Sequence, residues 1–229
     1  ISWMGGGRNM SGVSQWNKRE LQGGGGGNSW SGIACSANGT IIAACAINSF
    51  VYVSWDAGMN WSTHSCPYQQ WTSVCMDSTG MKMRATVLSG NIWTSENGGV
   101  TWTQRVVGAG NLEWSDIKCS RDGVKLIAAG GYGHSGFGAA NPTYFSYDMG
   151  VTWSGFGLTR SDTGWWAVAS SADGTKLAAV FNGHHHANVS TNIFVMGYPT
   201  GGNGYAIEGF HTIKLLGDGV DLSANEHYW

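Results

Sequence analysis

A short pattern that occurs five times along the chain constrains the fold more than any other feature of the sequence. Each copy begins with an aromatic residue, continues with an apolar segment of the kind found in β-strands, and ends in a Gly turn. The copies begin at Trp30, Trp71, Trp114, Trp166 and Phe210. Successive copies start roughly 40–50 residues apart, so each repeat is long enough for several short strands.

A repeat of this length, with several short strands in each unit, is typical of a β-propeller blade. The sequence therefore predicts one all-β domain over residues 1–229, a five-bladed β-propeller of four-stranded antiparallel blades. The blades are expected at residues 30–70, 71–113, 114–165 and 166–209, with residues 210–229 and 1–29 together forming the fifth. The segment that begins at Phe210 has room for two strands. We therefore expect the N-terminal segment to supply the other two and to close the ring.

Three octets of the approximate form Ser-x-Asp-x-Gly-x-Thr-Trp follow in the first three repeats, at residues 54–61, 95–102 and 146–153. Asp or Asn binds nearby backbone N–H groups, Gly takes a positive φ and Trp covers the turn, so each octet predicts a hairpin turn with a largely buried Trp. The residues with this structural role are Ser54, Asp56, Gly58, Trp61, Ser95, Asn97, Gly99, Trp102, Ser146, Asp148, Gly150 and Trp153. The octets resemble the Asp-box (BNR) repeat of sialidases, sortilin-type receptors and other propellers. This resemblance implies a structural turn on the blade rim, away from the ligand face.

Charge and cysteine content narrow the choice of partners and location. The formal net charge is −2, so we expect neither a nucleic-acid partner nor a charged membrane surface, and no apolar run is long enough to insert into a membrane. The five cysteines lack metal-type spacing, although Cys66 and Cys75 flank a blade junction and could pair. Glycosylation triplets at Asn9, Asn60 and Asn188 favour a secreted or extracellular protein.

The alternation of strand direction predicts which face of the blades binds a ligand. The Gly turns and the octets should share one face, and the longer links at residues 130–141, 155–162 and 181–188 should share the other. Aromatic rings suit the C–H face of a sugar, while His, Arg and Asp suit its hydroxyls, so we expect a carbohydrate cleft near the third and fourth blades. Its expected residues are Tyr132, His134, Phe137, Arg160, Asp162, Trp165, His184 and His186.

The sequence leaves three classes of function open. Small propellers of this size resemble lectins, and a lectin that binds a glycan or glycoprotein reversibly, as a monomer or an oligomer, is the leading hypothesis. A glycoside hydrolase of sialidase-like architecture is one alternative. However, the Arg-Ile-Pro motif of sialidases is absent, and the remaining face acids Glu113, Asp116, Asp162 and Glu208 form no recognisable motif. A non-catalytic protein-docking scaffold is the other alternative. No catalytic residue, cofactor or metal site is assigned, and His184 with His186 would need further ligands to hold a metal.

Overall fold

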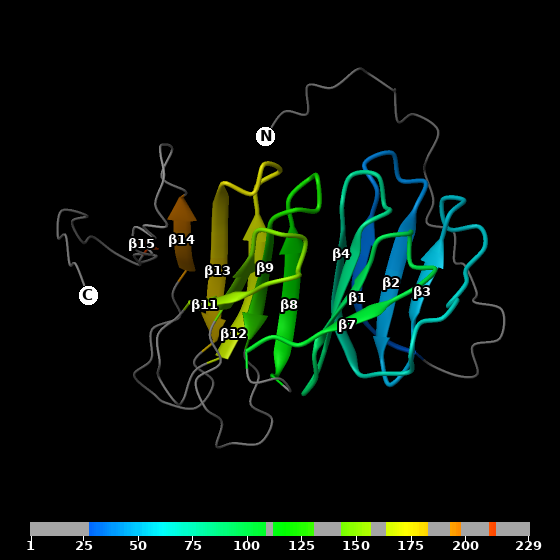
Figure 1. Ribbon diagram of the computed structural model, residues 1–229, viewed down its shortest axis with the longest axis horizontal. Helices are drawn as coiled ribbons and strands as arrows, with labels where there is room; N and C mark the ends of the chain where they lie inside the picture. Colours follow the sequence, from blue (N-terminus) through cyan, green and yellow to red (C-terminus); the bar gives the residue numbers. More distant parts are fainter. Residues whose placement is uncertain are drawn as a thin grey trace, which may run out of the picture.

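The computed structural model describes residues 28–108, 112–130, 143–156, 164–182, 193–197 and 211–213 of the chain. Within these ranges the chain forms β-strands in four antiparallel sheets and contains no helix (Figure 1). The sheets follow one another along the chain, and each sheet consists of consecutive strands. The prediction of an all-β fold built from antiparallel, mostly four-stranded blades is therefore confirmed.

We refer to the four sheets as blades 1 to 4. Blade 1 contains β1 (Ser29–Cys35), β2 (Ile42–Ile47) and β3 (Val51–Ser54). Blade 2 contains β4 (Trp71–Met76), β5 (Met83–Val87), β6 (Ile92–Ser95) and β7 (Thr103–Arg105). Blade 3 contains β8 (Trp114–Cys119), β9 (Leu126–Gly130), β10 (Thr143–Ser146) and β11 (Ser154–Phe156). Blade 4 contains β12 (Gly164–Ser170), β13 (Lys176–Asn182), β14 (Ile193–Gly197) and β15 (His211–Ile213).

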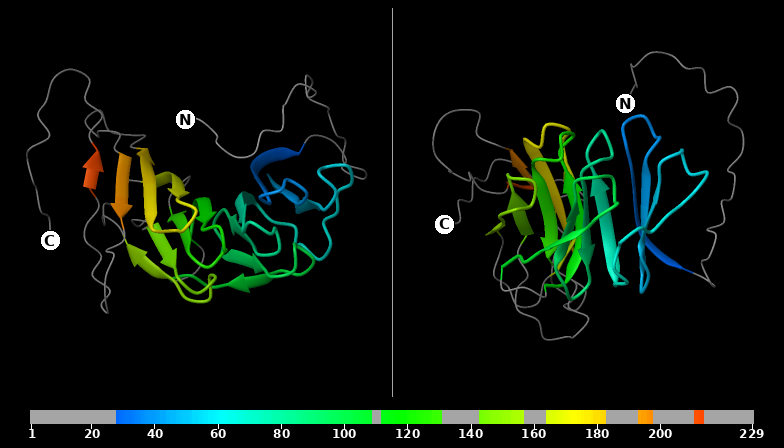
Figure 2. Two further views of the ribbon diagram at one scale, coloured as in Figure 1. Left: turned by 90° about the horizontal axis from the view of Figure 1, so that it is seen from above. Right: turned by 45° about the vertical axis from the view of Figure 1, so that its right-hand side comes forward.

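The first strands of the blades pack against one another in chain order, so the described strands form an arc (Figure 2). The repeat tryptophans occupy the junctions between blades. Trp71 is fully buried with Val51 and Val53 of blade 1, and Trp114 is buried with Ile92 of blade 2. Burial of a large ring at each junction holds neighbouring blades together.

The sequence analysis placed the start of blade 4 at Trp166. In the structure the aromatic residue that begins blade 4 is Trp165. In blades 2 and 3 the repeat Trp is followed by a β-bulge, and three residues later comes a buried apolar residue. Trp165 has the same register, because the bulge follows it and Val168 lies three residues further along. Trp166 occupies the bulge and is half exposed.

A second difference concerns the C-terminal part of the chain. The sequence analysis placed residues 210–229 at the start of a fifth blade, whereas β15 pairs with β14, with Ile213 opposite Ile193. β15 thereby covers the outer edge of blade 4, as β7 and β11 cover the edges of blades 2 and 3. An uncovered third strand would leave a row of unpaired backbone groups, and β15 pairs with that row in blade 4. Residues 1–27 and 214–229, which were expected to close the ring, lie outside the described residues.

Backbone hydrogen bonds also join the first turns of consecutive blades. The N–H of Ala37 donates to the carbonyl of Ser78 at 2.9 Å, and the N–H of Ser78 donates to Arg121 at 2.7 Å. The N–H of Arg121 donates in turn to Ala172 at 2.6 Å. A continuous series of peptide hydrogen bonds therefore crosses all four described blades.

Candidate functional site

One face of the blades carries the Gly turns together with the octets. In each of three blades an octet N–H donates to a carbonyl of the Gly turn beside it: Ala57 to Thr40 at 2.8 Å, Gly98 to Met81 at 2.8 Å and Met149 to Val124 at 3.0 Å. The links between second and third strands, and between blades, lie at the opposite ends of the strands. We call the face with the Gly turns and octets the turn face, and the opposite face, which carries the links, the loop face.

The octets are turns that satisfy their own polar groups. Asp56 accepts hydrogen bonds from the Asn60 N–H at 2.8 Å, from Asn60 Nδ2 at 2.7 Å and from Ser54 Oγ at 2.8 Å. These hydrogen bonds lower the pKa of Asp56 to about 2. Gly58 has a φ of 85°, and its carbonyl accepts the indole N–H of Trp61 at 3.1 Å. The Asp56 carboxylate thus forms its hydrogen bonds within its own turn.

The second and third octets repeat this arrangement around Asn97 and Asp148. Thr101 N–H donates to Asn97 and Thr152 N–H donates to Asp148, at 2.9 and 2.8 Å. The three octet tryptophans are only partly buried, which is less than the sequence analysis expected. Each indole lies over the turn and leaves part of its surface to solvent, because its N–H reaches back to the Gly carbonyl of its own octet.

Most of the ligand residues expected near blades 3 and 4 lie outside the described residues. These are Tyr132, His134, Phe137, Arg160, Asp162, His184 and His186. Trp165 is described, and its side chain is 4% exposed in a core with Ile127 and Phe145. A ring enclosed in this way has no face for a sugar, so the assignment of Trp165 as a ligand residue was wrong. Its role is to pack blade 4 on blade 3.

Asp116, one of the expected face acids, links three blades. Its carboxylate accepts from Ser73 Oγ of blade 2 at 2.7 Å and from the Val168 N–H of blade 4 at 3.1 Å. Lys118 forms an ion pair with the same carboxylate. Asp116 therefore has structural partners on both sides and is not positioned as a free acid or base. Asp162 and Glu208 lie outside the described residues.

The loop face carries an open cleft of about 450 Å³ between blades 1 and 2. It lies among the β2–β3 link, the link from blade 1 to blade 2 and the β5–β6 link. Its walls are rich in carboxamides, which come from all three links and from β7. The carboxamide and aromatic residues that line the cleft are Asn48, Tyr68, Gln69, Gln70, Asn91, Trp93 and Gln104.

Backbone hydrogen bonds fix the walls of this cleft. The N–H of Gln69 donates to the Ser49 carbonyl at 2.9 Å, and the N–H of Leu88 donates to the Gln70 carbonyl at 2.8 Å. The β5–β6 link turns at Ser89, which has a φ of 52°. The link between the blades is therefore held to both second-to-third-strand links, and the carboxamides project from a supported backbone.

The electrostatics of the cleft suit an uncharged polar ligand. No Asp, Glu, Lys, Arg or His is among its lining residues. The Tyr68 side chain is 62% exposed, and its ring packs edge-on against Phe50 at 5.5 Å. Asn91 Oδ1 is buried and receives no hydrogen bond. The cleft thus offers donors, acceptors, an aromatic surface and one buried oxygen that lacks a donor, but no pair of groups for acid–base catalysis.

Sequence reasoning missed this cleft because it favoured the longest loops. The signal was present in two short links, Tyr68-Gln69-Gln70 and Ser89-Gly90-Asn91, which place carboxamides next to an aromatic or a turn. Their convergence depends on how closely the links of the neighbouring blades 1 and 2 approach each other, which one sequence does not reveal. Within the described ranges no three His, Cys, Asp or Glu side chains gather as a metal site. No described helix is long and apolar enough to cross a membrane.

No protein-family model and no curated protein matches this chain. The structure is similar to solved β-propeller proteins. The GH74 xyloglucanase from Xanthomonas campestris is 12% identical with a TM-score of 0.59, covering 80% of this chain and 29% of that one. YCF48 from Cyanidioschyzon merolae is 15% identical with a TM-score of 0.55, covering 88% and 62%. Hydrazine synthase from Kuenenia stuttgartiensis is 11% identical with a TM-score of 0.57, covering 73% and 51%.

These similarities concern the fold alone, because all three identities are low. The chain spans less than two thirds of the length of each of the three structures. The blade architecture is that of β-propeller proteins, and the activities of the three proteins are not transferred with it.

Proposed function

We propose that this protein binds a neutral carbohydrate reversibly, as a lectin does, in the loop-face cleft between blades 1 and 2. The observation that carries the proposal is the convergence of five carboxamides and two aromatic rings without any charged side chain. A carboxamide donates and accepts at once, which matches the hydroxyl groups of a sugar. An exposed ring such as Tyr68 provides a surface for the apolar C–H face.

Asn91 gives the proposal a specific polar contact. Its Oδ1 atom is buried beside the cleft and has no donor. A buried acceptor that stays unpaired costs about 1–3 kcal/mol, so a ligand hydroxyl that reaches it gains affinity from this pairing. We expect a small shift of the Asn91 side chain to bring this oxygen to a hydroxyl of the bound sugar, while Gln70 and Gln104 bind hydroxyls further along the cleft.

The same cleft argues against a glycoside hydrolase at this site, since that chemistry needs two carboxyl groups flanking the scissile bond.

Docking of an uncharged peptide is the second candidate function. It is favoured by the same carboxamides, because a carboxamide can also bind the N–H and C=O groups of a peptide backbone. The two candidates differ in what they bind, so a glycan screen separates them.

Three further points of the sequence analysis are also proposals. We infer a fifth blade that closes the ring, supported by Trp30 and Ile33 of β1, which are 52% and 73% exposed. The corresponding Trp71 and Val74 of β4 are buried against the preceding blade. Membership of the Asp-box family is supported by the turn geometry of the octets, and secretion by the glycosylation triplets.

The test is a glycan array probed with the purified chain, followed by titration calorimetry on each sugar that binds. Tyr68→Ala and Gln104→Ala should weaken binding roughly 5- to 30-fold, the effect of losing about 1–2 kcal/mol. Tyr147→Ala is the matched control, because Tyr147 is an exposed tyrosine on the turn face. A blank array with folded protein, or equal weakening by Tyr147→Ala, would contradict the proposal. Turnover of a chromogenic glycoside would instead support the glycoside hydrolase alternative.

A further inference from the structure

Two cysteines from neighbouring blades meet in the core between blades 2 and 3. Cys75 lies on β4 and is 5% exposed, and Cys119 lies on β8 and packs against the same buried cluster. β4 and β8 pack directly against each other, and the two thiols interact electrostatically. Both cysteines carry free thiols in this structure.

Two hydrogen bonds between the strands bracket this pair. On one side, Ser73 Oγ donates to Asp116 Oδ1 at 2.7 Å. On the other side, the Ser78 N–H donates to the Arg121 carbonyl at 2.7 Å. The strands are therefore held together just before and just after the two thiols, which keeps both side chains against the same core cluster, as a disulfide between them requires.

The two thiols differ in acidity. Burial raises the pKa of Cys75, whereas the interaction with the neighbouring Cys75 thiol lowers the pKa of Cys119. Cys119 is also the more exposed of the two. Cys119 is accordingly the thiol that forms the nucleophilic thiolate, and Cys75 is the thiol that resolves.

Cys66, the partner that the sequence analysis considered for Cys75, lies elsewhere. It belongs to the core between blades 1 and 2, where its sulfur accepts the Val51 N–H at 3.2 Å. Cys75 faces the core on the other side of blade 2. The pairing of Cys66 with Cys75 is therefore not the one that the fold favours.

We propose that Cys75 and Cys119 form a disulfide that joins blade 2 to blade 3 covalently. With oxidised glutathione as the oxidant, the Cys119 thiolate attacks one glutathione sulfur and expels the other as a thiolate, giving a mixed disulfide. The Cys75 thiol then loses its proton and its sulfur attacks the Cys119 sulfur, expelling the second glutathione. The two cysteine protons end on two molecules of glutathione, so two thiols are oxidised while one disulfide is reduced.

The consequence is a covalent bond at a blade junction that otherwise depends on packing and hydrogen bonds. It closes a loop about one repeat long, which restricts the unfolded chain. An extracellular location would favour the oxidised form, because disulfides persist in oxidising compartments.

The experiment compares the purified full chain after incubation with oxidised glutathione and with dithiothreitol. We expect peptide mapping of the oxidised sample to identify one cross-linked peptide pair, containing Cys75 and Cys119. Its Tm should exceed that of the reduced sample by about 5–10 °C. Cys75→Ala and Cys119→Ala should each abolish both effects. Cys35→Ala should change neither the cross-link nor the Tm. It is a matched control because Cys35 occupies the same position in β1 as Cys119 does in β8.

Peptide mapping of the unmutated chain keeps the test decisive even where an alanine variant folds poorly. Three results would overturn the proposal: a cross-link between other cysteines such as Cys45 and Cys66, glutathione attached to Cys35 alone, or two free thiols at positions 75 and 119 after oxidation.

Discussion

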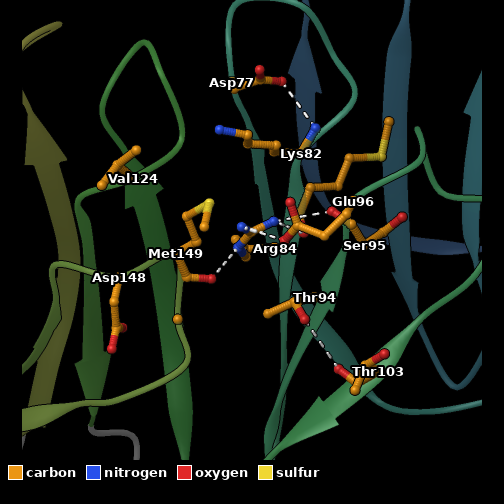
Figure 3. A network of polar contacts seen from close by, with 12 residues as sticks. Asp77, Lys82, Arg84, Thr94, Ser95, Glu96, Thr103, Val124, Asp148 and Met149 are labelled. Atoms are coloured by element: carbon orange, nitrogen blue, oxygen red, sulfur yellow. Dashed lines mark hydrogen bonds and ion pairs between the residues drawn. The ribbon is translucent and has the colours of Figure 1, made fainter.

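Arg84 of blade 2 donates a hydrogen bond from Nε to the carbonyl of Met149, in the third octet, at 3.0 Å (Figure 3). The guanidinium is 1% exposed, and its Nη1 also donates to the carbonyls of Met83 and Ser95 at 2.9 and 3.0 Å. Nη2 makes no aligned hydrogen bond but lies 2.7 Å from an oxygen of Glu96. One side chain thus ties blade 2 to the turn face of blade 3.

Arg84→Met should destabilise the fold by about 1–3 kcal/mol, because three carbonyls lose their donor in a buried place. Urea unfolding monitored by tryptophan fluorescence measures the change. Glu96→Gln is the control: it removes only the ion pair, whose carboxylate side is 51% exposed, and should cost less than about 1 kcal/mol. Equal losses for the two variants would mean that the ion pair, and not the carbonyl contacts, holds Arg84.

Trp165→Ala should cost about 3–5 kcal/mol, as expected for loss of a large ring from a core. Trp166→Ala should cost much less, since Trp166 is 50% exposed. The two adjacent residues form an internal comparison by thermal or urea unfolding. The reverse ranking would restore Trp166 as the start of blade 4.

Ile33→Ala distinguishes an open arc from a closed ring. In the described arc Ile33 is 73% exposed, so its truncation should have almost no effect. If a fifth blade covers it, as we propose, the cost should approach the roughly 1–3 kcal/mol expected for a buried apolar side chain. Val74→Ala, at the equivalent buried position of β4, provides the reference value in the same unfolding assay.

The stability of the protein should decrease at acid pH partly through Asp56. Its pKa is lowered to about 2 by hydrogen bonds, first from the Asn60 N–H, then from the Asn60 side chain and Ser54. Because the unfolded pKa is about 3.9, the carboxylate stabilises the fold above that pH, and this contribution is lost as pH falls toward 2. Asp56→Asn should therefore lose less Tm between about pH 4 and pH 2 than the unmutated chain. Asn97 fills the same position in the second octet, so Asn fits the turn.

The parts of the fold that follow from local chemistry were predictable. The strands after Trp71 and Trp114 and the octet turns depend on apolar spacing, Gly conformation and side-chain hydrogen bonds within a few residues. The position of Trp165 was obscured because a second tryptophan, Trp166, follows it directly. The bulge is the same in blades 2 and 4, and the three-residue spacing from Trp165 to Val168 equals that from Trp71 to Val74.

What the sequence analysis missed depends on contacts between repeats. β15 matches the sequence pattern of a first strand but pairs with β14 as a fourth strand, and this pairing depends on which strand edge is open in the folded protein. The cleft gathers Asn48, Gln70 and Gln104 from separate segments, and none of them belongs to a motif. Loop length indicated the loop face, but it did not indicate which blades carry the cleft.

The hydrogen bonds between the first turns use only peptide groups, and this frees the side chains at those positions. Ala37, Ser78 and Arg121 differ in size and charge, yet their N–H groups make the same link to the next blade. Proline alone is excluded at such a donor position, since it lacks the N–H. The side chain at these positions can therefore change from methyl to hydroxymethyl to guanidinium-bearing without altering the hydrogen bonds that join the blades.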